Sequence, residues 1–277
     1  MPNEEVEFDF LKERARIIRR HVIDMTCAAG SGHPGGSLSA TDILCTLYFK
    51  VMKHDPKAPQ WKQRDRFVLS KGHVAPALYA VLAESGYFPV KELDTLRELG
   101  SRLQGHPSYG KLPGIEMSTG SLGQGISIAN GMALAAKLDS ADNRIYCLCG
   151  DGELQSGQNW EAAMLAAHYD LDNLVVFVDR NRLQTMGDTE DVLSLEPLAD
   201  KWSAFGWNVI EIDGHDFAAI IKACEDAKRC RGRPTVVIAN TVKGRGVSFM
   251  ENNPDFHGKC CNPEQKEKAM CELEECL

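Results

Sequence analysis

Two oxygen-bearing side chains, Asp151 and Asn181, are the first candidates for chemistry in this sequence. Each follows a short apolar run of the kind that forms a buried parallel strand, and Asp151 lies in the turn Gly150-Asp151-Gly152. Because the carboxyl ends of parallel strands meet at one edge of a sheet, we expect the two side chains to face one crevice. Such oxygens suit Mg²⁺ or Ca²⁺, and Mg²⁺ commonly also binds phosphate oxygens. The pair therefore predicts a site for a metal and a diphosphate, although Gly-Asp-Gly alone is also a common turn composition.

Four of the eight histidines, His33, His73, His106 and His257, fall in loops at or near the ends of predicted helices or strands. An imidazole titrates near neutral pH, so histidines at such positions could move protons or bind a polar substrate. Any one of them alone is more often a surface or packing residue. Their shared setting, together with the predicted metal site, favours a catalytic role.

A glycine-rich stretch at residues 118–125 precedes a predicted helix at 126–136. Glycines before a helix N-terminus let backbone N–H groups approach an anion, and the helix dipole favours negative charge there. Glycines near a helix also permit close helix packing. The stretch is therefore either a phosphate-binding loop or a packing feature.

The elements that would position these residues alternate between strand and helix along the chain. The predicted strands are 65–69, 145–149, 174–178, 207–212 and 235–239. Helices are predicted at 8–29, around 76–82, and at 91–100, 126–136, 158–168 and 216–230. A further helix, which Ser39 or Thr41 can cap, is predicted to end near residue 52. A mostly polar helix at 263–276 closes the chain, within the tail 259–277. This alternation predicts one α/β domain over residues 1–277, with a doubly wound, mostly parallel sheet and helices on both faces.

Composition limits the classes of protein to which the chain can belong. Its formal net charge of −8, without a dense Lys/Arg run, argues against a general nucleic-acid binder. No apolar run reaches the length of a membrane span, and no secretory signal opens the sequence. Six of the ten cysteines fall within predicted helices or strands, where a free thiol behaves as a small apolar group. We therefore expect free thiols and a cytoplasmic protein that binds neither nucleic acid nor membrane.

Six short motifs occur in the order and approximate spacing found in transketolases. They are residues 31–35, 70–73, 105–107, 119–125, 150–152 and 252–258. Over nearly its whole length the chain resembles the N-terminal, diphosphate-binding half of that family. The resemblance implies a thiamine-diphosphate-binding fold and the transfer of a two-carbon ketol unit from a ketose phosphate to an aldose phosphate.

The same resemblance implies thiamine diphosphate and Mg²⁺ as cofactors, with Ca²⁺ or Mn²⁺ as substitutes. By this resemblance, the metal ligands would be Asp151, Asn181 and the backbone carbonyl of Leu183. The residues that it places on the cofactor are His73, Gly120, Leu122, Asp151, Gly152, Asn181 and His257. It assigns His33, His73 and His257 to the reactive end of the cofactor, and His106 to the substrate channel farther out.

In this family the glutamate that activates the cofactor belongs to a second, pyrimidine-binding domain, which would begin where this sequence stops. The chain is thus similar to split transketolases, so a partner subunit carrying that domain and an α2β2 heterotetramer are expected. Two positions depart from the family pattern. Ser156 stands where many transketolases have an interface glutamate, and Thr185 stands where a branched apolar residue usually packs on the cofactor.

Three other interpretations remain open. Deoxyxylulose-phosphate synthase shares Gly-Asp-Gly and a Lys-Gly-Arg-Gly like residues 243–246, but that enzyme is one long chain. The α subunit of a 2-oxoacid dehydrogenase fits less well, because the four loop histidines look like a sugar-handling set. A non-catalytic cofactor-binding module would have no use for intact metal ligands.

Overall fold

The computed structural model describes residues 2–275, and within them five strands form one parallel sheet. The strands are β1 (Arg66–Leu69), β2 (Ile145–Gly150), β3 (Leu174–Arg180), β6 (Asn208–Asp213) and β7 (Thr235–Asn240). Their order across the sheet is β1-β2-β3-β7-β6, and every neighbouring pair is parallel. The central strand β3 is buried along its whole length, which explains the apolar run at 174–178.

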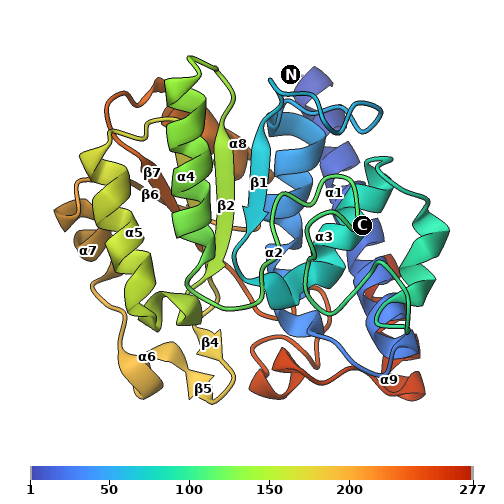
Figure 1. The fold of residues 1–277 in the computed structure, drawn as a ribbon. Helices are drawn as coiled ribbons and strands as arrows, with labels where there is room; N and C mark the ends of the chain where they lie inside the picture. The colour runs from blue at the N-terminus through green and yellow to red at the C-terminus, as the bar shows by residue number, and fades with distance from the viewer. Residues whose placement is uncertain (1, 276–277) are drawn as a thin grey trace.

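Helices cover both faces of this sheet (Figure 1). They are α1 (Pro2–Ala28), α2 (Pro34–Thr46), α3 (Ala75–Glu84), α4 (Gly125–Leu138), α5 (Gly157–His168), α6 (Thr189–Leu193), α7 (Leu198–Ala204), α8 (Phe217–Arg229) and α9 (Pro263–Glu275). Cys147 and Val176 face α4, α5 and α7, whereas Leu148 and Phe177 face the core shared with α1, α2, α3 and α8. This arrangement confirms the predicted doubly wound α/β fold class.

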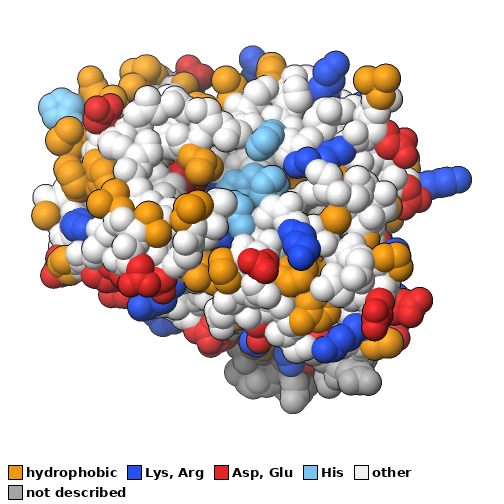
Figure 2. Space-filling model, turned by 90° about the horizontal axis from the view of Figure 1, so that it is seen from below, with side chains coloured by type: hydrophobic (Ala, Val, Ile, Leu, Met, Phe, Trp, Pro, Cys, Tyr) orange, Lys and Arg blue, Asp and Glu red, His pale blue; other side chains and the backbone are white. Residues whose placement is uncertain are grey.

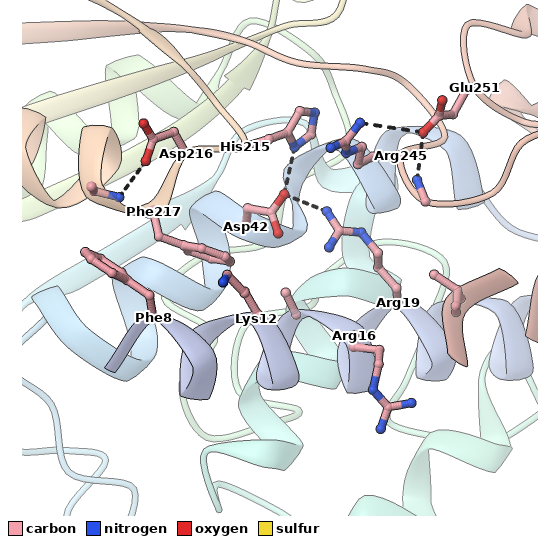
Figure 3. Close-up of a pocket in the computed structure, with 14 residues that line it drawn as sticks. Phe8, Lys12, Arg16, Arg19, Asp42, His215, Asp216, Phe217, Arg245 and Glu251 are labelled. Carbon is pink, nitrogen blue, oxygen red and sulfur yellow. Dashed lines mark hydrogen bonds and ion pairs between the residues drawn. The ribbon is translucent and has the colours of Figure 1, made fainter. Parts of the chain in front are cut away.

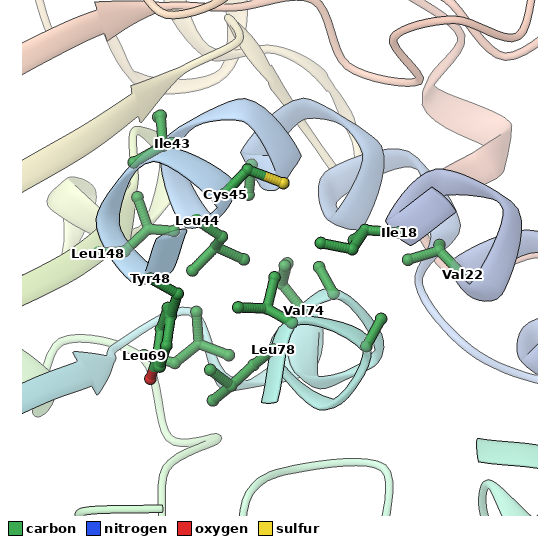
Figure 4. Packing of buried hydrophobic residues seen from close by; sticks show 14 of the residues in the cluster. Ile18, Val22, Ile43, Leu44, Cys45, Tyr48, Leu69, Val74, Leu78 and Leu148 are labelled. Atoms are coloured by element: carbon green, nitrogen blue, oxygen red, sulfur yellow. The ribbon is translucent and has the colours of Figure 1, made fainter. Parts of the chain in front are cut away.

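The larger of the two cores fixes α2 in place. Figure 4 shows Leu44 and Cys45 of α2 among Ile18 of α1, Leu78 of α3 and Leu148 of β2. All five side chains are buried, and truncating a leucine in such a core typically costs about 2–5 kcal/mol. The position of α2 is therefore well determined, and so is the loop residue that comes directly before it.

That residue is His33, which takes the N-cap position because α2 begins at Pro34. The prediction that Ser39 or Thr41 caps the helix is wrong. Both lie inside α2, where their hydroxyls donate to backbone carbonyls three and four residues earlier. Proline is well suited to the first helical position, since its fixed φ is already helical and it needs no N–H partner there.

Other boundaries also differ from the prediction. Residues 91–100 do not form a full helix, because the 3₁₀ turn η3 (Val90–Thr95) ends before Arg97, whose φ is 62°. The hairpin β4 (Leu183–Gln184) and β5 (Gly187–Asp188), together with α6 and α7, was not predicted. α9 covers the closing helix through residue 275, and the rest of that prediction lies outside the described residues.

The described cysteines carry free thiols, and Cys230 follows α8 instead of lying within a helix as predicted. None of the helices in the described part of the chain is both long and apolar enough to cross a bilayer.

Candidate active site

The carboxyl ends of β1, β2, β3 and β7 lie at one edge of the sheet, beside the hairpin β4–β5 (Figure 1). A cavity of about 220 Å³ opens there. Its lining is His33, Gly36, Lys71, His73, Gly120, Leu122, Gly150, Asp151, Gly152, Glu153, Asn181, Leu183, Gln184, Thr185, Lys243 and His257. Figure 2 looks onto this edge and shows imidazoles gathered near its centre. Segments far apart in the sequence therefore meet at one cavity.

Asp151 and Asn181 face this cavity from the ends of neighbouring strands, as the strand-end argument predicted. Asp151 accepts hydrogen bonds from the N–H groups of Gly152 (2.8 Å) and Arg182 (2.6 Å), and from the Arg180 guanidinium (3.2 Å). Burial raises the pKa of Asp151, and the neighbouring charge of Asp179 raises it further. A bound cation would offset both effects, so the carboxylate suits a metal ligand.

Two side-chain oxygens at this point of the cavity, one from Asp151 and one from Asn181, are available to a hard cation. The carboxylate of Asp151 has about four lone-pair sites and accepts three bonds, so one site is left. Asn181 Oδ1 accepts one bond, from the Leu183 N–H (3.1 Å). Among the described residues no group of three or more His, Cys, Asp or Glu side chains could hold a metal, so amide and carbonyl oxygens would have to complete the ligand set.

Two buried lysines, Lys71 and Lys243, supply positive charge to the same cavity. Lys71 forms an ion pair with Asp179, which is fully buried. Lys243 Nζ donates to the Leu183 carbonyl (3.0 Å) and lies 2.8 Å from His257 Nδ1. Burial lowers the pKa of Lys243 to about 8, and the charge of Lys71 contributes. Lys243 thus already donates a hydrogen bond to the Leu183 carbonyl, the oxygen that a metal would also use.

Three of the four loop histidines form one cluster. The ring centroids of His33 and His73 are 5.1 Å apart, those of His33 and His257 5.6 Å, and those of His73 and His257 5.3 Å. Burial lowers the pKa of His33 to about 4 and that of His257 to about 3, and it lowers the pKa of His73 further. All three imidazoles are therefore neutral at pH 7. Within the described chain His33 Nδ1 is buried without a hydrogen-bond partner.

His106 lies outside the cavity lining, behind Gly120. Gly120 has a φ of 144°, and a Cβ added there would approach the His106 ring to 2.9 Å. A Cβ at Gly36 would point between Lys71 Nζ (3.7 Å) and His73 Nε2 (3.8 Å). The bare backbone at Gly36 therefore leaves room beside the lysine and the histidine for a ligand.

Glu153 was not singled out from the sequence, yet it holds two parts of the cavity wall together. Its buried carboxylate accepts bonds from the Ser70 hydroxyl, the Gly123 N–H (2.9 Å) and the Gly150 N–H (3.0 Å). Burial raises the pKa of Glu153, while these hydrogen bonds oppose the rise. The only sequence signal for this role is its position directly after Gly-Asp-Gly. Lys71 was likewise overlooked, although it follows the end of a predicted strand.

The two positions that depart from the family pattern have different surroundings. Thr185 lines the cavity, next to the hairpin that carries Leu183. Ser156 is half-buried and precedes α5, and a Cβ at Gly123 would approach its Oγ to 2.6 Å. Ser156 therefore contacts the glycine-rich loop and not the cavity itself.

Comparisons with known proteins identify the family of the chain. Residues 11–272 match the family described as the thiamine diphosphate binding domain of transketolase. The chain is 49% identical over 264 residues to the 6-deoxy-6-sulfo-D-fructose transketolase subunit SqwG of Clostridium sp. (strain MSTE9), covering 95% of this chain and 96% of that protein. It is 44% identical to a subunit of the apulose-4-phosphate transketolase of Actinobacillus succinogenes, over 98% of each chain.

Solved structures of transketolase share the fold. The transketolase of Campylobacter jejuni superposes with a TM-score of 0.91 at 37% identity, over 96% of this chain but only 43% of that one. The family match spans nearly all of the sequence, and five of the six motifs contribute residues to one cavity. The chain therefore belongs to the family of transketolase thiamine diphosphate-binding domains.

Proposed function

We propose that this chain is the cofactor-binding subunit of a two-chain transketolase. It would transfer a two-carbon ketol unit from an anionic ketose to an aldose. The observation that carries the proposal is the cavity itself, whose lining combines Asp151, Asn181 and Leu183 with three neutral imidazoles. The relatives named as transketolase subunits match the chain along nearly their full lengths, which supports the two-chain form.

The residues of the cavity fit a metal-bound diphosphate. Asp151, Asn181 and the carbonyl of Leu183 would hold the divalent cation, with Mg²⁺ as the proposed ion. Lys71 and Lys243 add positive charge beside it, and Gly36 and Gly120 leave room for close approach. Bound thiamine diphosphate supplies a nucleophilic carbon and an electron sink for cleaving a carbon–carbon bond.

The histidines would act on the hydroxyl and carbonyl groups of the sugar. A neutral imidazole can accept a proton at one nitrogen and donate at the other, so His33, His73 and His257 can orient hydroxyls and move protons at pH 7. His106, which is exposed and lies beside Gly120, would meet the substrate farther out.

Exposed apolar side chains near the cavity support a second chain as partner. Large hydrophobic residues with more than a third of their surface exposed include Leu122, Met164, Leu165, Met186 and Leu193. Figure 2 shows hydrophobic side chains gathered on one side of the imidazoles. Such patches commonly mark interaction sites. We propose that a pyrimidine-binding subunit covers them in an α2β2 assembly, and that the assembly works in the cytoplasm, where the free thiols would stay reduced.

The test is ketol transfer by the purified chain, with and without that partner subunit, in the presence of thiamine diphosphate and Mg²⁺. Ketoses with a phosphate or a sulfonate tail are the first donors to compare, because two relatives are named for such sugars. We expect no transfer by the chain alone and transfer by the pair. Robust turnover by the chain alone would contradict the two-chain form, and no turnover by the pair with any of these donors would contradict the activity.

A further inference from the structure

A second cavity of about 640 Å³ lies behind the active site, between α1, α2, α8 and the segment after β7. Figure 3 shows His215 in its wall, pointing at Asp42. The His215 Nδ1 lies 2.7 Å from Asp42 Oδ2, and Nε2 accepts a hydrogen bond from the Val242 N–H at 2.8 Å. Because Nε2 accepts, the proton of the neutral ring sits on Nδ1 and is donated to Asp42. These two contacts fix both the tautomer and the orientation of the ring.

The surroundings of Asp42 stabilise its charged form, which accepts the hydrogen bond from His215. It is 4% exposed and also binds the Arg19 guanidinium at 2.6 Å. Burial opposes its charge, but Arg19 and the hydrogen bond from His215 outweigh that effect and hold the pKa of Asp42 below its usual value. A buried carboxylate that receives a histidine Nδ1–H fixes an imidazole in the way that carboxylates orient metal-binding histidines.

Val242, whose N–H donates to His215, directly precedes Lys243 in the sequence. The N–H groups of Thr241 and Gly244 donate to the backbone carbonyls of Arg180 (3.2 Å) and Gly35 (2.9 Å), whereas the N–H of Val242 donates to a side chain. Lys243 leaves the backbone between these anchors and reaches the Leu183 carbonyl and His257. The direction of the Lys243 side chain therefore depends on where His215 places residue 242.

We infer that His215, oriented by Asp42, is a positioning residue that aims Lys243 at the diphosphate end of the cofactor site. This inference rests on the proposed function, since it assigns Lys243 to cofactor binding. His215 itself lies outside the lining of the active-site cavity.

Three substitutions separate the two contacts of the ring. His215→Ala removes both. His215→Gln can place an amide oxygen near the former Nε2 and so still accept from Val242. His215→Asn can donate to Asp42 from near the former Nδ1 but does not reach Val242. A matched control is His21→Ala, which removes another histidine–carboxylate pair, His21 with Glu84 (2.8 Å), far from the cavity lining.

The first measurement is the dissociation constant of thiamine diphosphate with Mg²⁺, by calorimetry on the full chain with and without its partner subunit. We expect Ala and Asn at position 215 to weaken binding by roughly 10- to 100-fold, the usual effect of losing a residue behind a ligand-binding group. Gln should retain most of the wild-type affinity, and the His21 control should retain all of it. Wild-type affinity in both His215→Ala and His215→Asn would overturn the inference.

The second measurement is amide hydrogen exchange at Val242 and Gly244, which needs no cofactor. In His215→Ala and His215→Asn, both amides should exchange faster than in wild type. In His215→Gln they should stay protected. If Gly244 stays as protected in His215→Asn as in wild type, His215 does not order the segment and the inference is overturned.

If the wild-type chain and pair do not bind thiamine diphosphate, the proposed function fails, and the exchange pattern still decides whether His215 positions residues 242–244. Should His215→Ala fail to fold, the comparison of Gln with Asn gives the same decision.

Discussion

Asp151 contributes both charge and geometry to the proposed metal site, so its removal should abolish cofactor binding. We expect Asp151→Ala to lose Mg²⁺-dependent binding of thiamine diphosphate, because the negative charge of the diphosphate would be left without its counter-ion. Calorimetry on the assembled complex measures this. A matched control is Asp65→Asn, since Asp65 is another buried carboxylate, bonded to the N–H groups of Lys53 and Arg144. The control should lower stability and leave the affinity unchanged; unchanged affinity in Asp151→Ala would show that the metal lies elsewhere.

His33 and His257 approach each other across the cavity, and each should matter to turnover more than to folding. We expect His33→Ala and His257→Ala to slow ketol transfer by about 10²- to 10⁴-fold, the usual span for a positioned acid or base. Circular dichroism should stay native, because both side chains are only partly buried. Full transfer activity in both variants would show that the two imidazoles are packing residues without a role in catalysis.

The low pKa of His33 also predicts a loss of stability in acid. Folding lowers this pKa from 6.5 to about 4, so between these values the unfolded chain takes up a proton that the folded chain does not. The free energy of unfolding should therefore be unaffected by this group above pH 6.5 and fall as the pH drops toward 4. The slope from His33 cannot exceed about 1.4 kcal/mol per pH unit, the value for one proton, and partial exposure of the ring should keep it lower. Urea denaturation of wild type and His33→Gln from pH 4 to 7 checks this, and equal slopes would contradict it.

At the scale of elements, the contact between the end of β1 and the glycine-rich loop sets the shape of the cavity. A Cβ on Gly72 would come within 2.6 Å of the Gly120 nitrogen and 2.7 Å of the Thr119 carbonyl carbon. We expect Gly72→Ala to push the loop away, to destabilise the chain by about 1–3 kcal/mol and to weaken cofactor binding. Denaturation and calorimetry measure the two effects.

A helical glycine provides the control for that substitution. Gly131 lies in the interior of α4, and an added Cβ there meets nothing within 4 Å. Gly131→Ala should therefore stabilise the chain by about 0.5–1 kcal/mol through helix propensity and leave binding unchanged. A Gly72→Ala chain as stable as wild type would mean that the loop can move at little cost.

Much of the fold could be predicted because buried strands leave a clear sequence signal. All five parallel strands were located to within two residues at either end, and Asp151 and Asn181 followed from the rule that ligands gather at strand ends. The hairpin β4–β5 was missed because strands of two residues have no periodicity to detect. Lys71 and Glu153 were missed because their roles depend on partners distant in sequence, Asp179 and Gly123.

At the scale of the whole assembly, Ser156 predicts how independently two active sites behave. A glutamate at this position would lie near the exposed Glu161 and, in the proposed assembly, near carboxylates of the partner subunit. Carboxylates at close range share protons and raise one another's pKa, which couples their titration. We expect the wild-type sites to turn over independently and Ser156→Glu to couple them, as read from the pH–rate profile of the complex. Ser156→Gln, similar in size but neutral, is the control, and identical profiles for all three proteins would refute the interface argument.

The position of β7 in the sheet has a consequence for biosynthesis. β7 is the last strand to be made, yet it lies between β3 and β6 and is the neighbour through which β6 joins the sheet. Until residues 235–240 have left the ribosome, β6 lacks that neighbour, and the buried strand β3 presents an open apolar edge, a known hazard for aggregation. The cavity also needs Lys243 and His257, which emerge later still. A nascent chain therefore cannot recruit cofactor to a complete site until residue 257 has been synthesised, and it depends on rapid insertion of β7 to close the exposed edge.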